Sequence, residues 1–381
     1  MRENESRARM RLAMIIPNLE DGGAQRQFAL IANELSDHKG IDLFIILLGR
    51  GPHFAILGEG PRKNMYVNEF SSFSRPDAFR FVARCLRQIR PDAILSWLHP
   101  ADVIVATVKW SVPRARWISA ERDSSYPRRT VYRIRRLLVS MFSTAVIANS
   151  FAGREYWRSN HYRKPVFVIE NIVSTARVAP TQRESSEIVV AGRLEEQKNN
   201  EIVIRCFALA VERIPELRLT FVGDGSQRDL LENLARELHV SDRVQFEGYR
   251  ESILPYLDRA RLLVTMSKHE GMPNVLAEAV MRGTPIVASR IPEHARILGV
   301  DYAHFADLSG SPDALAEVIW NAYSNWSHDS LRSARMQLAD RTAAAASIEY
   351  VSALTTVLGR EGHAPDPGES VDTMQERRNV T

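Results

Sequence analysis

The stretch SKHEGMPNVLAEAVMRGTPIVAS, residues 267–289, is the most informative part of the sequence for the fold. Proline is tolerated in the first turn of a helix but not in its interior, so we predict a loop at Glu270–Gly271 and a helix over Pro273–Arg282. Gly283 is typical of the residue that ends a helix, and TPIVAS is typical of a buried strand. A helix followed by such a strand predicts a parallel α/β sheet.

Two acidic residues in this stretch, Glu270 and Glu278, raise a chemical question. Glu270 falls in the loop before the helix, whose free N–H groups attract anions, and Glu278 falls on the second turn. A carboxylate pairs well with the vicinal hydroxyls of a ribose, as acidic residues do in dinucleotide sites. The alternative is that Glu278 is an exposed surface residue and Glu270 only stabilises the helix dipole.

The same alternation of short apolar runs and helical patterns extends through most of the chain. In the first half the predicted strands are 11–18, 41–48, 91–97, 115–120, 144–150 and 166–170, with helical patterns such as 24–35 and 77–89 between them. In the second half they are 187–192, 217–223, 243–248, 261–267 and 284–289. This order predicts an α/β protein with two doubly wound, Rossmann-like domains that face each other across a cleft.

The length of 381 residues also favours two domains, because single cores stop growing near about 250–300 residues. We predict an N-terminal domain over 1–173, a polar linker over 174–187 and a C-terminal domain over 188–358, whose last helix could pack back on the N-terminal domain. The tail over 359–381 has few apolar residues and is predicted to be disordered.

Composition and charge limit the class of protein. The chain is 45% hydrophobic, its two cysteines have no metal-type spacing, and no apolar run approaches the roughly 20 residues of a membrane span, so we expect a cytoplasmic protein. Residues 1–180 hold 28 basic and 16 acidic residues, a net charge of +12, whereas residues 181–381 carry −8. No nucleic-acid recognition motif accompanies the basic residues, so we expect no nucleic-acid partner.

Polar residues follow the predicted strands of the second half. Arg193 and Lys198 follow the first strand, and a guanidinium and an ammonium in such a place suit a diphosphate. Gly223 and Gly225 permit a tight turn and the close approach of a ligand, although a purely structural turn is equally consistent. The loop over 249–252 could border a nucleobase or be an ordinary connection.

These pieces, in this order, resemble a known family. GRLEEQK (192–198), FVGDGSQRDLLENLAREL (221–238), VQFEGY (244–249) and the stretch 267–289 look like the C-terminal domain of retaining glycosyltransferases of family 4, which have the GT-B fold. The spacing of Glu270 and Glu278 matches that family's E-x7-E pattern. The resemblance covers nearly all of residues 12–358, is specific over 188–290, and includes DGGAQR (21–26) and AVIANS (145–150) in the first half.

The resemblance implies transfer of a hexose from a nucleoside diphosphate to an acceptor hydroxyl, with retention of the anomeric configuration. Arg193 and Lys198 would neutralise the leaving diphosphate, Glu278 would bind the ribose, and Glu270 would bind the sugar. The implied donor site comprises Gly22, Gly23, Gly192, Arg193, Lys198, Gly223, Tyr249, Glu270, Gly271, Met272, Pro273, Asn274, Val275 and Glu278. The chain has no D-x-D motif, so no metal and no other cofactor is expected.

The N-terminal half departs from the family's pattern. Many relatives have a histidine after a strand near the reacting sugar, but here the strand at 115–120 leads into Glu121 and Arg122. We therefore predict Glu121 or His99 as the catalytic residue of this half, beside Arg193, Lys198 and Glu270. A structural role for His99 remains the alternative, and the acceptor chemistry stays open.

A basic, amphipathic helix is predicted over 128–142. Val131, Ile134, Leu138, Met141 and Phe142 cluster on a helical wheel, whereas the arginines at 128, 129, 133, 135 and 136 take the other side. One interpretation is an interfacial helix on an anionic membrane that carries a lipid-linked acceptor, with Arg128, Arg129, Arg133 and Arg136 as contacts. The other is a domain helix with a solvated basic face.

The function predicted from the sequence is a glycosyltransferase that moves a hexose or N-acetylhexosamine from a nucleoside-diphosphate sugar, UDP-linked by preference, to a glycan or lipid-linked acceptor in bacterial polysaccharide or lipopolysaccharide synthesis. It would act in the cytoplasm or peripherally at the inner face of the plasma membrane. The alternatives are a sugar-nucleotide epimerase of the same fold and a non-catalytic, nucleotide-binding subunit at the membrane. The sugar, base, linkage and acceptor are left open.

Overall fold

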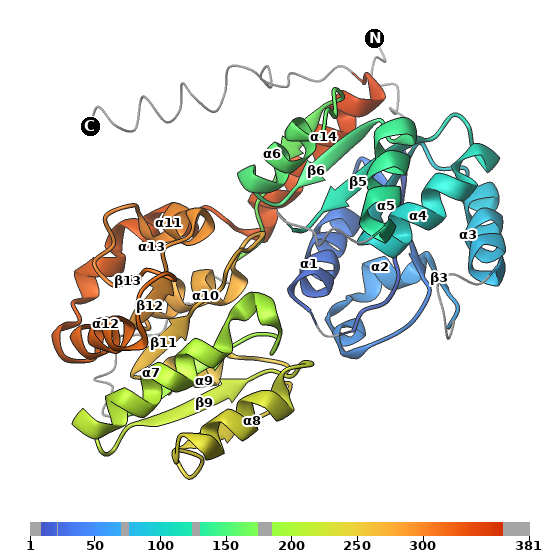
Figure 1. Ribbon diagram of the computed structural model, residues 1–381. Helices are drawn as coiled ribbons and strands as arrows, with labels where there is room; N and C mark the ends of the chain where they lie inside the picture. Colours follow the sequence, from blue (N-terminus) through green and yellow to red (C-terminus); the bar gives the residue numbers. More distant parts are fainter. Residues whose placement is uncertain (1–8, 21, 70–75, 124–129, 174–184, 361–381) are drawn as a thin grey trace, which may run out of the picture. The chain divides into compact units, whose positions relative to one another are not determined.

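The computed structural model describes residues 9–20, 22–69, 76–123, 130–173 and 185–360, and divides the chain into two compact units (Figure 1). Unit 1 comprises Met1–Ile172 and Ala343–Thr381, and unit 2 comprises Val173–Thr342. Each unit has its own parallel sheet with helices on both faces, which confirms the predicted α/β class with two doubly wound, Rossmann-like parts.

Unit 1 is built on seven parallel strands in the order β3-β2-β1-β4-β5-β6-β7. Leu12 of β1 pairs with Leu43 of β2 on one side and with Ala93 of β4 on the other, so the strand order reverses between β1 and β4. The strands are β1 (Met10–Ile16), β2 (Ile41–Leu47), β3 (Met65–Val67), β4 (Ala93–Trp97), β5 (Arg116–Glu121), β6 (Ala145–Ala148) and β7 (Val166–Val168).

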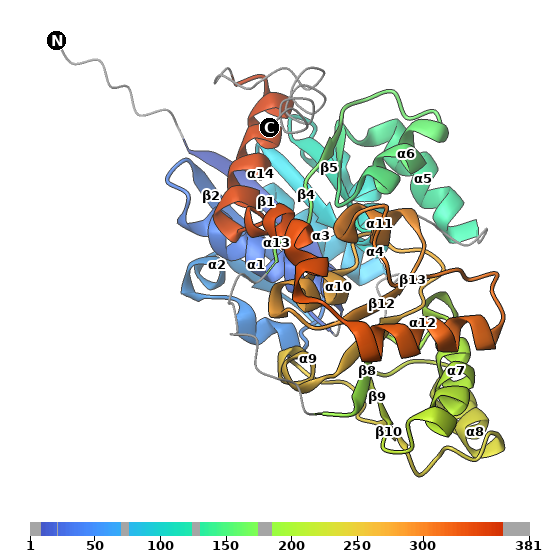
Figure 2. The same ribbon diagram turned by 90° about the vertical axis from the view of Figure 1, so that its left-hand side faces the viewer.

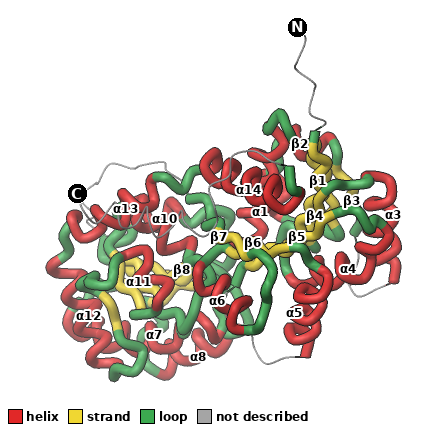
Figure 3. The backbone as a smooth tube through the Cα atoms, turned by 90° about the horizontal axis from the view of Figure 1, so that it is seen from above, coloured by secondary structure: helices red, strands yellow, loops and turns green. Residues whose placement is uncertain are grey.

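Helices cover both faces of this sheet, because successive residues of each strand point to opposite sides. Leu12 and Met14 pack in the core with residues of α1 and α14, whereas Ala13 and Ile15 pack with residues of α3 and α4. Figures 1 and 3 show these helices beside the sheet of unit 1. The helices are α1 (Gly23–Asp37), α2 (Glu59–Lys63), α3 (Pro76–Ile89), α4 (His99–Val108), α5 (Thr130–Phe142), α6 (Phe151–Ser159) and α14 (Ala343–Leu358), with short 3-10 turns η1 (Pro52–Ile56) and η2 (Lys109–Ser111).

The C-terminal helix α14 returns to unit 1 and lies beside α1 (Figure 2). Tyr350 and Leu354 of this helix are buried in the same core as β1. The guanidinium of Arg122, which follows β5, donates to the Tyr350 hydroxyl and lies over the Trp97 ring. The helix is therefore held by apolar packing and by one half-buried arginine.

Unit 2 repeats the same topology with six parallel strands in the order β10-β9-β8-β11-β12-β13. The order reverses between β8 and β11, where Leu263 pairs with Val189. The strands are β8 (Glu187–Ala191), β9 (Arg218–Val222), β10 (Val244–Phe246), β11 (Leu262–Thr265), β12 (Ile286–Ser289) and β13 (Phe305–Ala306).

The helices of unit 2 also form two layers. Ile188 and Val190 pack under α7, α8 and α12, whereas Val189 and Ala191 pack with α9, α10, α11 and α13. The helices are α7 (Asn200–Arg213), α8 (Arg228–Glu237), α9 (Leu254–Arg259), α10 (Asn274–Arg282), α11 (Pro292–Leu298), α12 (Pro312–Asn325) and α13 (Arg332–Ala339), with 3-10 turns η3 (Glu196–Lys198) and η4 (His328–Leu331).

The stretch 267–289 folds as predicted. Pro273 caps the N-terminus of α10, and Gly283 ends the helix with a left-handed φ of 67°, before strand β12. The short strands β3 and β13 were not predicted, because each contributes at most three residues and lies at the edge of its sheet.

The orientation of helix α5 contradicts the prediction that the basic side of this helix faces solvent. Arg135 is only 2% exposed, whereas Val131, Ile134, Leu137, Met141 and Phe142 are 42–59% exposed. The physical reason is that two buried carboxylates of unit 1 bind the Arg135 guanidinium and turn the apolar side of the helix outward. Arg133 is exposed and Arg136 is half-buried, and the predicted contacts Arg128 and Arg129 lie outside the described residues.

Most of the predicted linker and tail, 174–184 and 361–381, also lie outside the described residues. Among the helices that the structure describes, none has the length and apolar character needed to cross a bilayer.

Candidate active site

The strongest candidate site lies in unit 2 where the strand order reverses. At such a point the loops that leave two neighbouring parallel strands diverge to opposite faces, and ligands bind beyond the carboxyl ends of the strands. Lys198 follows β8 and Glu270 follows β11, and the Lys198 Nζ lies 2.6 Å from the Glu270 Oε1. The fold thus joins two predicted site residues that are 72 positions apart in the sequence.

Glu270 is held as a carboxylate. Its side chain is nearly buried, and its Oε1 also accepts a hydrogen bond of 2.6 Å from the Ser267 hydroxyl. Burial alone would raise the pKa of Glu270, but the Lys198 ammonium and the hydrogen bonds from Lys198 and Ser267 outweigh burial and lower it. The site therefore presents a negative charge beside a partly exposed ammonium.

A small pocket opens beside this ion pair. Arg193 is exposed at its edge, so a guanidinium and an ammonium both border the pocket. The lining residues come from the ends of β8 and β11 and from the loop between β8 and α7: Val190, Ala191, Gly192, Arg193, Lys198, Asn200, Thr265 and Met266. This arrangement suits a compact anion such as a diphosphate.

Gly223 is needed for the packing of the strand-end loops. Its φ is 141°, and a Cβ atom at this position would lie 2.0 Å from the Gly192 carbonyl oxygen. The Gly223 N–H in turn donates to the Gly248 carbonyl, which brings the loop before Tyr249 over the end of β9. The close approach at Gly223 is thus to backbone, and a side chain there would displace the loop that carries Arg193.

The remaining predicted donor residues lie at the start of α10 and in its second turn. Glu278 is buried, and Pro273 precedes the first helical residue, Asn274. The first turn of α10 contains no acidic residue, so its N-terminal dipole is not neutralised within the helix. Tyr249 is half-buried and follows the edge strand β10, two strands away from β8.

Unit 1 has its own reversal point, between β1 and β4. Gly22 caps α1 after β1, and His99 is the first residue of α4 after β4. The Trp97 indole donates a hydrogen bond of 2.9 Å to the Ala24 carbonyl, so β4 holds the start of α1, where Gly22 and Gly23 lie. Sequence reasoning did not find this role of Trp97, because nothing local marks a buried indole as a loop anchor.

His99 is a neutral base in a partly buried place. Burial and the nearby Arg135 guanidinium lower its pKa, although the Glu121 carboxylate acts in the opposite direction. Its ring packs edge-on against Tyr132 of α5, with 5.4 Å between ring centroids. An imidazole in this state can accept a proton, so the structure is compatible with the predicted role of His99.

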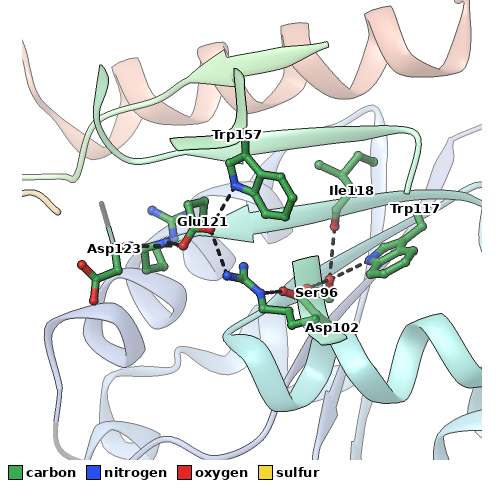
Figure 4. Close-up of polar contacts among 9 residues, drawn as sticks. Ser96, Asp102, Trp117, Ile118, Glu121, Asp123 and Trp157 are labelled. Atoms are coloured by element: carbon green, nitrogen blue, oxygen red, sulfur yellow. Dashed lines mark hydrogen bonds and ion pairs between the residues drawn. The ribbon is translucent and has the colours of Figure 1, made fainter. Parts of the chain in front are cut away.

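Glu121 belongs to a buried ion cluster instead of a ligand surface. Glu121 binds the Arg135 Nη1 over 2.9 Å, and Asp102 binds the Arg135 Nε over 2.6 Å. Figure 4 labels the two carboxylates, Glu121 and Asp102. The Ser96 hydroxyl donates to Asp102, and the Trp157 indole donates to Glu121 over 2.9 Å. We call Asp102, Glu121 and Arg135 the ion cluster of unit 1.

The geometry of this cluster corrects the assignment of Glu121. Its other oxygen, Oε1, accepts the backbone N–H groups of Arg122 and Asp123, so both carboxylate oxygens have partners. Glu121 and Asp102 are completely buried, and burial raises the pKa of Asp102 even though Arg135 opposes the rise. We therefore assign Glu121 a structural role, which leaves His99 as the predicted catalytic residue of unit 1.

Two further residues near Glu270 were not predicted. Ser267 binds the carboxylate, and His294, in the first turn of α11, lies near enough to shift its pKa. A serine at the end of a strand and a single histidine in a short helix carry no distinctive sequence pattern. Within the described ranges, no group of three or more histidine, cysteine or acidic side chains is arranged to hold a metal ion.

Comparisons with known proteins agree with this architecture. Residues 175–340 match the model of the family described as Glycosyl transferases group 1. A lipopolysaccharide core biosynthesis glycosyltransferase, LpsE of Rhizobium meliloti, is 28% identical over 71% of this chain and 76% of the relative. A Campylobacter jejuni N-acetyl-D-galactosaminyltransferase that acts on an undecaprenol-linked glycan is 24% identical over 71% of this chain and 77% of that protein.

Solved structures share the fold. Anabaena Alr3699/HepE, in complex with UDP and glucose, superposes with a TM-score of 0.77 and 20% sequence identity, over 91% of this chain and all of that one. At this identity the likeness shows the fold alone, which is the two-domain GT-B architecture of glycosyltransferases. The matched family model, the named relatives and the shared fold together support a transferase: this chain is a glycosyltransferase built from two Rossmann-like units.

Proposed function

We propose that the protein transfers a hexose or N-acetylhexosamine from a UDP-sugar to a hydroxyl of a glycan or lipid-linked acceptor in bacterial lipopolysaccharide or polysaccharide synthesis, with retention of configuration. The observation that carries the proposal is the Lys198–Glu270 pair beside a small cationic pocket at the strand reversal of unit 2. The relatives LpsE and the Campylobacter enzyme support the reaction class, and the Anabaena structure with UDP and glucose supports the donor class.

In this proposal the ion pair separates when the donor binds. Lys198 and the exposed Arg193 turn to the diphosphate, and the freed Glu270 accepts hydrogen bonds from hexose hydroxyls. Fixed positive charge and the N–H groups at the start of α10 then stabilise the leaving diphosphate, which is where negative charge develops in the transition state. No covalent role is assigned to Glu270.

The other predicted donor contacts are also part of the proposal. Glu278 would accept two hydrogen bonds from the ribose diol, and the Gly271–Val275 segment would surround the hexose. Gly22 and Gly23, at the start of α1, would approach the donor phosphates, and His99 would take the acceptor's proton. Transfer without a bound metal stays a prediction, to be tested by activity in the presence of EDTA.

The first experiment is a thermal-shift comparison of UDP, GDP and ADP with their common sugar conjugates. A ligand at 100 times its dissociation constant adds about 2.7 kcal/mol to the free energy of unfolding, which gives a clear shift. We expect UDP and one UDP-sugar to stabilise the wild type and Glu278→Gln to lose this stabilisation. Stabilisation by GDP or ADP alone would contradict the UDP donor, and equal UDP binding by Glu278→Gln would contradict the ribose contact.

We also propose that unit 1 docks on an anionic membrane surface through helix α5. Five of the eleven large apolar side chains that are exposed in the described residues lie on this one helix. Such a stripe marks an interaction surface, and the exposed Arg133 and the net charge of +12 over residues 1–180 favour an anionic partner. A lipid-linked acceptor would be presented at that surface, on the cytoplasmic side.

A further inference from the structure

A buried chain of hydrogen bonds runs behind the Glu270 carboxylate. The Ser267 hydroxyl donates to Glu270, and the Ser267 carbonyl accepts a bond of 2.7 Å from the Ser289 hydroxyl. The His294 Nδ1 lies 2.9 Å from the Ser289 carbonyl oxygen. Ser267, Ser289 and His294 are all completely buried, so this chain connects the ends of β11 and β12 to the first turn of α11 without contact with solvent.

The protonation state of His294 follows from these partners. A carbonyl oxygen can only accept, so the Nδ1 carries the hydrogen and donates it to Ser289. Burial lowers the pKa of His294 to about 4, and the Lys198 ammonium adds to the lowering while Glu270 opposes it. The ring is therefore neutral, and its Nε2 is a hydrogen-bond acceptor.

If His294 served only to fill space in the core, an apolar residue would give a more stable fold. Its Nε2 has no hydrogen-bond partner among the described residues, and an unpaired buried acceptor costs free energy. A leucine would fill similar space without that cost, and the Ser289 carbonyl would still accept the Ile291 N–H over 2.9 Å. A residue that is unfavourable for stability next to a binding site is expected to be there for the site.

We propose that His294 is a positioning residue for Glu270: through Ser289 and Ser267 it fixes the loop that holds the carboxylate in the orientation that the donor hexose requires. The inference rests on the proposed function and deepens it, because it separates recognition of the sugar from recognition of the nucleotide. In the proposed function Lys198 leaves Glu270 when the donor binds, so Lys198 and Arg193 then contact the diphosphate without a hydrogen bond to this chain. Loss of His294 should therefore weaken binding of the donor's sugar and leave binding of its UDP part unchanged.

The test compares His294→Leu with His294→Asn. The asparagine amide can donate to the Ser289 carbonyl as Nδ1 does, whereas leucine cannot. Binding of UDP and of its glucose, galactose, N-acetylglucosamine and N-acetylgalactosamine conjugates is measured by calorimetry, with the conjugate that binds the wild type best as the reference. We expect His294→Leu to bind UDP within about twofold of wild type and the reference conjugate about tenfold more weakly, since small displacements of a binding group have large effects. His294→Asn should regain most of this loss.

Two further measurements separate positioning from a merely structural role. The denaturation midpoint of His294→Leu should equal or exceed that of the wild type. In a Glu270→Gln background, His294→Leu should add no further loss of affinity, because coupled residues are not additive. A lower midpoint with an unchanged ratio of sugar-conjugate to UDP affinity would overturn the proposal, as would additive losses in the double variant. A wild type that binds neither UDP nor any conjugate would instead refute the proposed function, and this role of His294 with it.

Discussion

The ion cluster of unit 1 and the Lys198–Glu270 pair of unit 2 are built from similar groups in similar places. Glu121 stands at the carboxyl end of β5 and Glu270 follows β11, and each binds a cation within 3 Å. In unit 1 both carboxylates and the arginine are buried, and indole, hydroxyl and backbone donors satisfy the remaining oxygens. In unit 2 the lysine is partly exposed and borders a pocket.

The difference shows how a strand-end carboxylate can serve structure in one unit and binding in the other. A fully buried and satisfied ion cluster cannot exchange its partners without exposing uncompensated charge, so it fixes the position of α5. An ammonium that still reaches solvent can leave its carboxylate for a diphosphate at small cost. Both carboxylates lie at or after the end of a strand, and the two sites differ in how deeply the charged groups are buried.

The largest effect is expected from breaking the ion cluster of unit 1. Arg135→Leu leaves Asp102 and Glu121 buried without their cation, so the free energy of unfolding should fall by about 3–5 kcal/mol. Urea denaturation measures this change. Arg133→Leu is the matched control, because Arg133 is exposed on the same helix and should change stability by less than about 0.5 kcal/mol. Equal stability of the two variants would show that the cluster does not anchor α5.

The second prediction concerns the ion pair of unit 2. Lys198→Ala should lower kcat/KM for the UDP-sugar by about 10²–10³, the size expected when one preorganised charge or donor is lost at the leaving group. The unfolding transition should stay close to that of the wild type. Lys268→Ala is the control, since Lys268 forms an exposed pair with Glu196 over 3.0 Å and does not line the pocket. Similar losses in both variants would contradict a specific role for Lys198.

The third prediction uses pH to test the burial of His294 in unit 2. Because the pKa of His294 is lowered from 6.5 to about 4 in the folded protein, the unfolded chain binds more protons between these values. Proton uptake by the unfolded chain at this group therefore lowers the free energy of unfolding as pH falls from 6.5 toward 4, by up to about 3 kcal/mol. His294→Leu should lack this part of the acid dependence in urea denaturation at pH 7, 5.5 and 4.5. If the free energy of unfolding depends on pH equally in the wild type and in His294→Leu, His294 is not buried as a neutral ring.

The smallest effect is expected at the surface of α5. Replacing Leu137 and Met141 together by serine should weaken binding to vesicles that contain anionic lipid by about tenfold, since each side chain contributes only part of the roughly 1.5–3 kcal/mol of full burial. Co-sedimentation with vesicles measures the binding. Ile348→Ser on α14 is the control, because Ile348 is even more exposed in the same unit but is the only exposed large apolar residue that the structure describes on its helix. Unchanged binding of the double variant would exclude α5 as the docking surface.

Much of the fold could be predicted from local patterns. The bounds of α10 follow from Pro273 and Gly283, and the buried strands follow from short β-branched runs, because both signals are set by neighbouring residues. The meeting of Lys198 and Glu270 could also be predicted, since both follow strands of one parallel sheet. Their roles toward a donor stay predictions.

The predictions that failed concern features set by contacts between residues far apart in the sequence. The helical wheel of α5 was correct, but its orientation was not, because Arg135 meets Asp102 and Glu121 only when β4, β5 and α4 are assembled. The burial of Glu121 was missed for the same reason. His294 carries no local pattern, and although Ser289 is only five residues away in the sequence, Ser267 approaches Ser289 only through the pairing of β11 with β12.

The sequence by itself determined the α/β alternation, the two-part organisation and the order of charged residues after the strands, because these depend on periodicity and on the residues that end helices. Only the tertiary structure decided which charges are buried and which remain accessible. The physical reason is that desolvation of a charge depends on everything packed around it, including residues far away in the chain. Two carboxylates with similar sequence surroundings thus became a structural anchor in unit 1 and a candidate ligand for a sugar in unit 2.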